Sequence, residues 1–319
     1  MRLKEKFYVL GLLAACGILY FFWSLHYSGY KSSTSMSPAA AAAAAKPNGY
    51  TYRLVVFGDS WSDGKNIQDP RRGKVWTEWL CSKFSCFHEN MAESSSSSAG
   101  AVVDNDELER IPNAKWSGSP LADLKTQMRR WMLKEEKATV GFTKEEIKRR
   151  QAYTIFSVSF GVWDIWRLLG QDLAAAKLSA QRSVATIFEE LSVLGTKWTA
   201  GEMKVVLMAA VDVTFLPAFK VHNETHRDAV PLVDEWNTQL RSHAKAWKNG
   251  PIFFLDTNSF LLDQLRERQL WVAGYIDTKD FGKDGMDWDN VDSACAVVSK
   301  KWLLENQEVC RVPEKYLFW

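Results

Sequence analysis

The chain has 319 residues, of which 46% are hydrophobic, and its 40 basic and 38 acidic residues give a formal net charge of +2. A chain of this length can bury one large core or two modest ones. The near-neutral balance of charge gives no indication of a nucleic-acid partner, and we expect none. Fifteen tryptophans are unusual, and such large rings line clefts as well as cores.

The first predicted element is an uncharged apolar run over 7–25, FYVLGLLAACGILYFFWSL, behind the basic start MRLKEK. Its length suits a helix that crosses a bilayer, and the basic flank favours a cytosolic N-terminus. We therefore expect a cytosolic tail over 1–6, an uncleaved transmembrane signal anchor over 7–27, and a type II membrane protein whose remaining chain is lumenal or extracellular. The alternative is a cleaved signal peptide and a secreted protein, but the apolar run is long for one.

Residues 28–49, SGYKSSTSMSPAAAAAAAKPNG, are rich in Ser, Ala and Pro and lack an apolar period. This composition is typical of a linker rather than of a packed core. We expect a stalk here, followed by one folded domain over 50–319.

The cysteines and one sequon agree with an exported domain. Cys81 and Cys86, and then Cys295 and Cys310, form two pairs that are close in sequence, and each pair is expected to close a disulfide loop in an oxidising compartment. A zinc site is the alternative, but it would need tighter CxxC spacing. Asn223 begins an Asn-Glu-Thr sequon and is a candidate glycosylation site in that compartment.

Along the domain, short and nearly continuous apolar runs alternate with helix-like segments. The runs lie at 53–57, 153–160, 204–211 and 251–255, and the helix-like segments at 74–84, 121–136, 173–194 and 233–248. Such runs are typical of strands covered on both faces. The alternation predicts an α/β fold, a doubly wound and mostly parallel sheet with helices on both sides, in one domain.

The first strand leads into VVFGDSWSDGKN at 55–66, where Ser60 lies between Asp59 and Asp63. In a parallel sheet the working residues lie at the carboxyl ends of the strands, so Ser60 is well placed for a site. A phosphate-binding P-loop would need GxxxxGK followed by Ser or Thr, whereas five residues separate the two glycines here. An α/β-hydrolase elbow would need GxSxG, which does not occur in the chain.

The stretch FGDSWSDGKN at 57–66 closely resembles the first block of the GDSL (SGNH) hydrolases, a family of lipases and acylhydrolases. The resemblance implies a flavodoxin-like, three-layer α/β/α fold and hydrolysis of carboxylic esters with Ser60 as the nucleophile. It also implies that no metal or organic cofactor is needed. Within this block, Gly58, Asp59 and Asp63 are expected to shape the loop rather than to react.

The second block of the family is an Asn-x-Ala run that ends in Gly-Ala. It is matched here by NMA at 90–92 and, after a serine run, by Gly100 and the alanine that follows it. The resemblance implies that the backbone amides of Ser60 and Gly100 hold the oxyanion of the reaction.

The third block, Gly-x-Asn-Asp in the family, is Gly161-Val162-Trp163-Asp164 here. Gly161 and Asp164 are expected to shape this loop, and Trp163 stands where the family has an asparagine that donates to the oxyanion. An indole donates one N–H, but its bulk argues against the same geometry. Because the loss of one donor costs about 10²–10³-fold in rate, this departure predicts a weaker enzyme rather than an inactive one.

The fourth block of the family is an Asp-x-x-His that supplies the base for the serine, often after a Cys...Pro-x-x-Tyr-x-Phe-Trp run. The chain has CRVPEKYLFW over 310–319 and then ends. We expect the base to lie just past Trp319, which would leave the 319-residue chain with little or no activity; the alternative is a protein that works without it. Removing the histidine of a serine triad costs on the order of 10⁶-fold in rate.

The histidines of the chain are His26, His88, His222, His226 and His243, and none follows His243. His222 and His226 have the i, i+4 spacing of a metal-binding pair on a helix, but they flank the sequon and are expected to be solvated loop residues. His243 lies among Arg and Lys residues and is expected on a helix surface. We therefore expect no metal site.

Two further classes of function stay open. A lumenal glycosyltransferase would use Asp-x-Asp to hold a metal and a nucleotide, and DND at 104–106 and DWD at 287–289 match that motif, although acidic loops produce it freely. A non-catalytic carbohydrate- or lipid-binding domain on the same fold is the other alternative, because fold does not fix function. The preferred interpretation is a membrane-anchored ester hydrolase whose substrate is an acetylated carbohydrate, a short-chain ester or a lipid.

Overall fold

The computed structural model describes residues 52–65, 73–94, 100–110, 120–199, 201–220, 226–276, 288–297 and 308–318. The predicted tail, anchor and stalk lie outside these residues, as does Asn223. Within the described residues, no helix combines the length and the apolar character needed to cross a membrane.

Five parallel strands form the central sheet, in the order β2-β1-β3-β4-β5. They are β1 (Tyr52–Gly58), β2 (Cys86–Asn90), β3 (Thr154–Ser159), β4 (Lys204–Met208) and β5 (Ile252–Leu255). In this order the winding of the chain reverses between β1 and β3, as in doubly wound α/β proteins. The predicted fold class is therefore confirmed.

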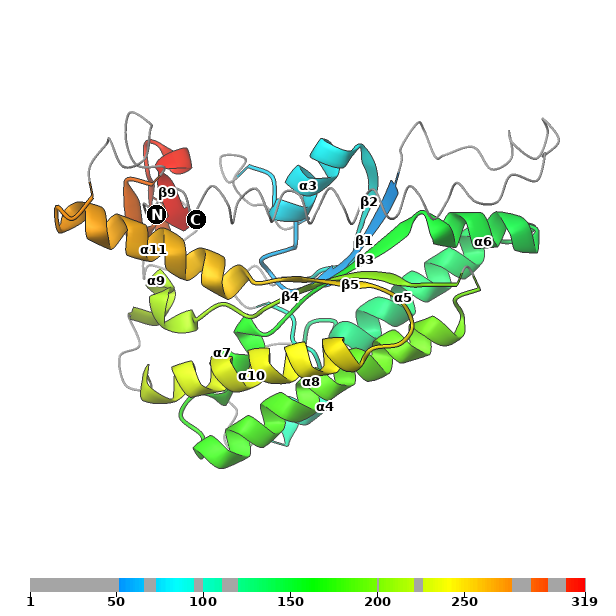
Figure 1. Cartoon of the computed structure of the whole chain (residues 1–319), viewed down its shortest axis with the longest axis horizontal. Coiled ribbons are helices and arrows are strands. Elements are labelled where there is room, and N and C mark those ends of the chain that lie inside the picture. The colour runs from blue at the N-terminus through cyan, green and yellow to red at the C-terminus, as the bar shows by residue number, and fades with distance from the viewer. Residues whose placement is uncertain are drawn as a thin grey trace, which may run out of the picture.

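The longer helices cover the two faces of this sheet (Figure 1). Helix α3 (Trp76–Phe84) lies on one face, and α5 (Leu124–Ala138), α8 (Leu173–Thr196) and α10 (His226–Ala246) lie on the other. The remaining helices are α4 (Asn105–Glu109), α6 (Lys144–Ala152), α7 (Val162–Leu168), η3 (Val213–Phe215), α9 (Pro217–Lys220) and α11 (Thr257–Val272).

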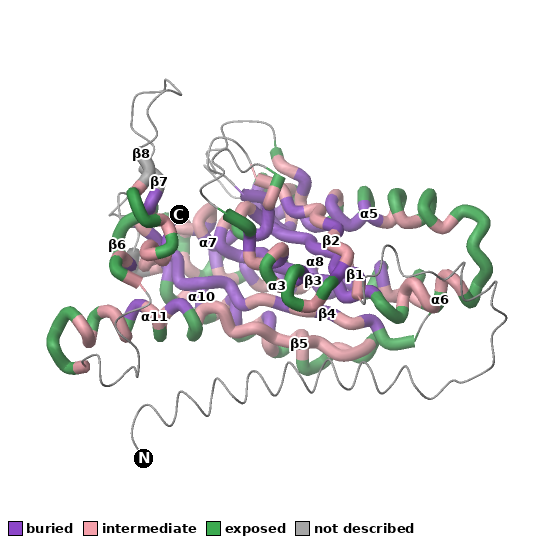
Figure 2. The backbone as a smooth tube through the Cα atoms, turned by 90° about the horizontal axis from the view of Figure 1, so that it is seen from above, coloured by how far each residue is buried: buried purple, intermediate pink, exposed green. Residues whose placement is uncertain are grey.

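Successive side chains of a strand point to opposite faces of the sheet, and β1 follows this rule. Val55 and Phe57 belong to the larger core, shared with α5, α8 and α10, whereas Leu54 and Val56 belong to the smaller core, shared with α3. Figure 2 shows buried backbone concentrated along the central strands. Because β1 is covered on both faces, its carboxyl end is held in one position.

The C-terminal segment forms two small ladders. Strand β6 (Asn290–Ala294) pairs in parallel with β9 (Tyr316–Phe318), and β7 (Ala296–Val297) pairs with β8 (Glu308–Val309) in the antiparallel sense, with η4 (Pro313–Lys315) before β9. Val291 and Phe318 are buried in the larger core.

Both predicted disulfides are confirmed. Cys295 is bonded to Cys310 and links the two C-terminal ladders, while Cys81 is bonded to Cys86 and ties the last part of α3 to the start of β2. In each bond the two Cα atoms lie 4.9 Å apart, within the usual range for a disulfide.

Candidate active site

Ser60 lies in a tight turn directly after β1. The N–H groups of Ser62 and Asp63 both donate to the Asp59 carbonyl at 3.1 Å, and the Trp61 N–H donates to Asp59 Oδ1 at 3.0 Å. The aspartate before the serine thus closes the turn with its backbone and its side chain, as expected of a loop-shaping residue. Ser60 is presented at the carboxyl edge of the sheet.

The backbone of Gly58 is hydrogen-bonded to the side chain of Gln127, a residue that the sequence analysis did not predict to lie near the site. The Gly58 N–H donates to Gln127 Oε1 at 2.9 Å, and Gln127 Nε2 donates back to the Gly58 carbonyl at 2.9 Å. A Cβ added at Gly58 would lie 3.0 Å from the Ser159 carbonyl oxygen of β3. The end of β1 is therefore fixed from α5 on one side and from β3 on the other.

The second block of the sequence fastens the far side of the same loop. Asp63 is buried, and its Oδ2 accepts from the Ser94 N–H at 3.0 Å and from the Ser94 hydroxyl at 2.7 Å. Asn90 Nδ2 donates to the Ser62 carbonyl at 2.6 Å. Asp63 therefore ties the loop after β1 to the segment that carries Ser94.

The side chain of Trp163 contacts the side chain of Ser60. Its indole Nε1–H donates to Ser60 Oγ at 2.8 Å. A Cβ added at Gly100 would lie 2.2 Å from Trp163 Nε1 and Cδ1 and 2.9 Å from the Ser60 backbone nitrogen. The three residues of the first, second and third blocks are therefore in contact, although they lie far apart in the chain. The bulk of Trp163, which argued against such a position, is accommodated because Gly100 has no side chain.

Helix α7 carries Trp163 and begins at a glycine for a steric reason. Gly161 has φ +124, a conformation that favours glycine, and a Cβ there would lie 2.7 Å from Ala210 Cβ and 2.8 Å from the indole nitrogen of Trp236. Gly161 therefore allows α7 to start tightly against β4 and α10. On α7 itself, the rings of Trp163 and Trp166 lie 5.8 Å apart.

Two carboxyl groups are buried behind these residues. Asp164 Oδ1 accepts from the Val103 N–H at 2.9 Å, whereas its Oδ2 has no hydrogen-bond partner among the described residues. Burial raises the pKa of Asp59 to about 8, opposed by the Trp61 N–H and reinforced by the charge of Asp164. Burial also raises the pKa of Asp164 to about 6, opposed by the Val103 N–H and by Arg167. Such paired, perturbed carboxyls are typical of functional sites.

The histidines with described side chains lie away from this edge. His88 lies halfway along the edge strand β2, where it is paired with Leu54 of β1, and burial lowers its pKa. His243 stacks on Phe188 at 5.1 Å, near the end of α10 that leads back to the start of β5. His26 and His222 lie outside the described residues. His226 is the first residue of α10 and not a loop residue as expected, and its side chain is not described.

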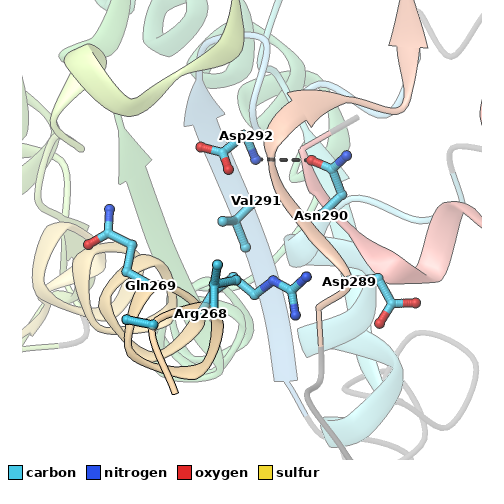
Figure 3. Close-up of a pocket in the computed structure, with 8 residues that line it drawn as sticks. Arg268, Gln269, Asp289, Asn290, Val291 and Asp292 are labelled. Atoms are coloured by element: carbon cyan, nitrogen blue, oxygen red, sulfur yellow. Dashed lines mark hydrogen bonds between the residues drawn. The ribbon is translucent and has the colours of Figure 1, made fainter. Parts of the chain in front are cut away.

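A separate pocket of about 350 Å³ lies between α11 and β6 (Figure 3). It is lined by Arg268, Gln269, Val272, Ala273, Asp289, Asn290, Val291 and Asp292. Asp289 belongs to the second Asp-x-Asp motif, whose Asp287 lies outside the described residues. In the first motif, Asp104 caps helix α4 by accepting from the N–H groups of Asp106 and Glu107.

Searches against models of known families and against curated proteins find no match to this chain. The geometry around Ser60 and the resemblance of its motif are therefore the grounds for a proposal of function.

Proposed function

We propose that this protein is a hydrolase of carboxylic esters that uses Ser60 as its nucleophile. The observation that carries the proposal is the meeting of Ser60 Oγ, the Gly100 backbone and the Trp163 indole N–H at the carboxyl edge of the sheet. Ester hydrolysis needs a hydroxyl that attacks and donors for the negative charge that develops on the carbonyl oxygen. The backbone amides of Ser60 and Gly100 take that donor role.

The reaction runs in two steps. Ser60 Oγ bonds to the carbonyl carbon and loses its proton to a base, and the carbonyl π electrons move to oxygen. When this tetrahedral species collapses, the bond to the leaving oxygen breaks, the protonated base gives that oxygen its proton, and the alcohol departs from an acyl-serine. Water then attacks the acyl-serine by the same route and releases the acid. Neither His88 nor His243 is placed to accept the Ser60 proton, because both lie away from the carboxyl edge.

An experiment that supplies the base from solution tests this proposal. The full chain and Ser60→Ala are assayed with p-nitrophenyl acetate over a series of imidazole concentrations, and the Ser60→Ala rate is subtracted at each concentration. Imidazole has a pKa near neutrality and accepts a proton from a hydroxyl that is otherwise a poor nucleophile. We expect the Ser60-dependent rate to rise with imidazole. Equal rates for the two proteins at every concentration would overturn the proposal.

A non-catalytic carbohydrate- or lipid-binding domain is the second candidate, and the aromatic rings around Ser60 favour it. Trp61 is exposed, and Trp163 and Trp166 pack together beside the serine. Aromatic faces of this kind bind apolar surfaces of ligands. A binding domain would retain its ligand affinity in Ser60→Ala and show no imidazole-dependent rate.

A further inference from the structure

We propose that the indole N–H of Trp163 is a third hydrogen-bond donor to the oxyanion formed at Ser60. This inference rests on the proposed function, and it assigns a reaction role to a residue that the family motif does not contain. The indole would act together with the backbone amides of Ser60 and Gly100.

The position of the donor is the first argument. Trp163 Nε1 lies 2.8 Å from Ser60 Oγ, at ordinary hydrogen-bond distance. In the tetrahedral species the oxyanion and Ser60 Oγ are bonded to the same carbon, so the oxyanion forms next to the atom that the indole already contacts. A small shift of the ring then transfers the hydrogen bond from Oγ to the oxyanion.

The chemistry of indole is the second argument. Its Nε1–H donates a hydrogen bond and accepts none. An asparagine amide can rotate so that its oxygen faces the oxyanion, whereas an indole has no acceptor to place there. It also cannot take the serine proton, so its contribution is limited to stabilising charge on oxygen. A donor that is already oriented is worth most in a site from which water is partly excluded.

The packing around the ring is the third argument. Gly100 leaves room for the pyrrole edge of the indole, because any Cβ there would collide with Nε1 and Cδ1 at 2.2 Å. The Val103 N–H donates to Asp164 at 2.9 Å and ties the start of α7 to the segment that carries Gly100. The donor and the Gly100 backbone are therefore held as one unit.

The first test compares two Trp→Phe variants in the imidazole-assisted ester assay. Trp163→Phe keeps a flat apolar ring and removes the N–H, and we expect the Ser60-dependent rate to fall about 100-fold, as on loss of one oxyanion donor. Trp131→Phe is the matched control, because the Trp131 indole donates at 3.1 Å to Glu89, which pairs with Val55 in the middle of β1, and not to Ser60. A Trp163→Phe rate within about threefold of the native rate, with Ser60→Ala inactive, would refute the inference and leave the proposed function standing.

Gly100→Ala is a second variant that leaves Trp163 in the sequence. Its Cβ would lie 2.2 Å from the indole and 2.9 Å from the Ser60 backbone nitrogen. It therefore displaces the indole and also crowds the Ser60 amide, and a loss of similar or larger size is expected. A Gly100→Ala protein with the native Ser60-dependent rate would show that displacing the indole has no effect, and would count against the inference.

The second test does not depend on turnover. Phenylboronic acid bonds through boron to Ser60 Oγ, releases the serine proton to solvent and forms a tetrahedral boronate anion whose oxygen mimics the oxyanion. In ¹⁵N-tryptophan-labelled protein, we expect the Trp163 indole N–H resonance to move on addition of the probe, and not to move in Ser60→Ala. The dissociation constant in Trp163→Phe should rise about tenfold, as on loss of one charge-assisted hydrogen bond.

The ester assay and the boronate experiment distinguish a failure of the proposed function from a failure of the role proposed for Trp163. A protein without ester turnover that binds the boronate through Ser60 and Trp163 would fail the proposed function and keep the inference. If the boronate forms no Ser60 adduct, or binds Trp163→Phe as tightly as the native chain, the inference is overturned.

Discussion

The two ends of strand β1 hold buried charge in opposite ways. At the amino end, Arg53 is 4% exposed and faces two carboxylates. Its Nε and Nη2 donate to Glu89 at 3.0 and 3.1 Å, and its Nη1 donates to Glu135 at 2.8 Å. Trp131 adds a further N–H to Glu89 at 3.1 Å, and Arg150 completes the pairing of Glu135. Each buried charge here has a partner of opposite sign.

At the carboxyl end Asp59 and Asp164 are buried together, and the half-buried Arg167 only partly offsets the charge of Asp164. Asp59 and Asp164 lie close enough for the charge of one to raise the pKa of the other, and Asp164 Oδ2 lacks a partner among the described residues. A fold keeps such an arrangement where it serves a site rather than the stability of the core. The comparison assigns stability to the amino end of β1 and agrees with the proposal that its carboxyl end serves a site.

The largest expected effect is on stability at the amino end. Arg53→Met leaves Glu89 and Glu135 buried without their shared cation, and breaking a buried pair in this way costs about 3–5 kcal/mol. Urea unfolding of the full chain measures the loss. Arg150→Met is the control, since it removes only the outer partner of Glu135 and should cost less. An Arg53→Met protein as stable as Arg150→Met would contradict the division between the two ends.

Two tryptophans sharpen the comparison, because the Trp131 indole donates to Glu89, a partner of Arg53, whereas the Trp163 indole donates to Ser60. Trp131→Phe removes a buried hydrogen bond to the charged Glu89 and should cost about 2–3 kcal/mol of unfolding free energy. Trp163→Phe removes a bond to a neutral, partly exposed hydroxyl and should cost about 1 kcal/mol or less. In the ester assay, by contrast, Trp163→Phe should lose more of the Ser60-dependent rate than Trp131→Phe. Equal losses of unfolding free energy in the two variants would show that the two indole hydrogen bonds do not differ in their contribution to stability.

The sequence predicted much of this fold because the four apolar strands are nearly continuous runs. It missed β2, whose sequence CFHEN is largely polar because β2 is an edge strand with one neighbour. It also missed α6, which has no buried residue, and α11, in which only Leu261 and Leu265 are buried. These helices have too small a buried face to leave a clear apolar period.

The candidate site was predictable where its residues lie in short motifs. Ser60, Gly100 and Trp163 were found from the blocks that contain them, and the structure brings them together. Gln127 was not found, because its bonds to Gly58 span 69 residues and leave no local pattern. The direction of the Trp163 indole also could not be read from the motif, since it depends on the space that Gly100 leaves.

The last prediction, a change in stability with pH, has the opposite sign to the first. Burial raises the Asp59 pKa from its ordinary 3.8 to about 8, so between these values the folded protein holds a proton that the unfolded chain has released. Stability therefore falls as pH rises, by about 1.4 kcal/mol per unit for a full proton. Asp59→Asn has no such proton and keeps an oxygen to accept the Trp61 N–H.

We expect the stability of Asp59→Asn relative to the native chain to grow by about 2 kcal/mol between pH 5.5 and pH 7.0. Urea unfolding of both proteins at the two pH values measures this change, and Asp164 titrates in both and largely cancels. Arg53→Met is destabilising at either pH because its loss comes from an unpaired buried carboxylate, whereas Asp59→Asn removes a buried carboxyl that lies near the charge of Asp164. If the difference in unfolding free energy between Asp59→Asn and the native chain stays constant with pH, Asp59 is ionised throughout this range. The carboxyl end of β1 would then hold an ionised buried group, as the amino end does.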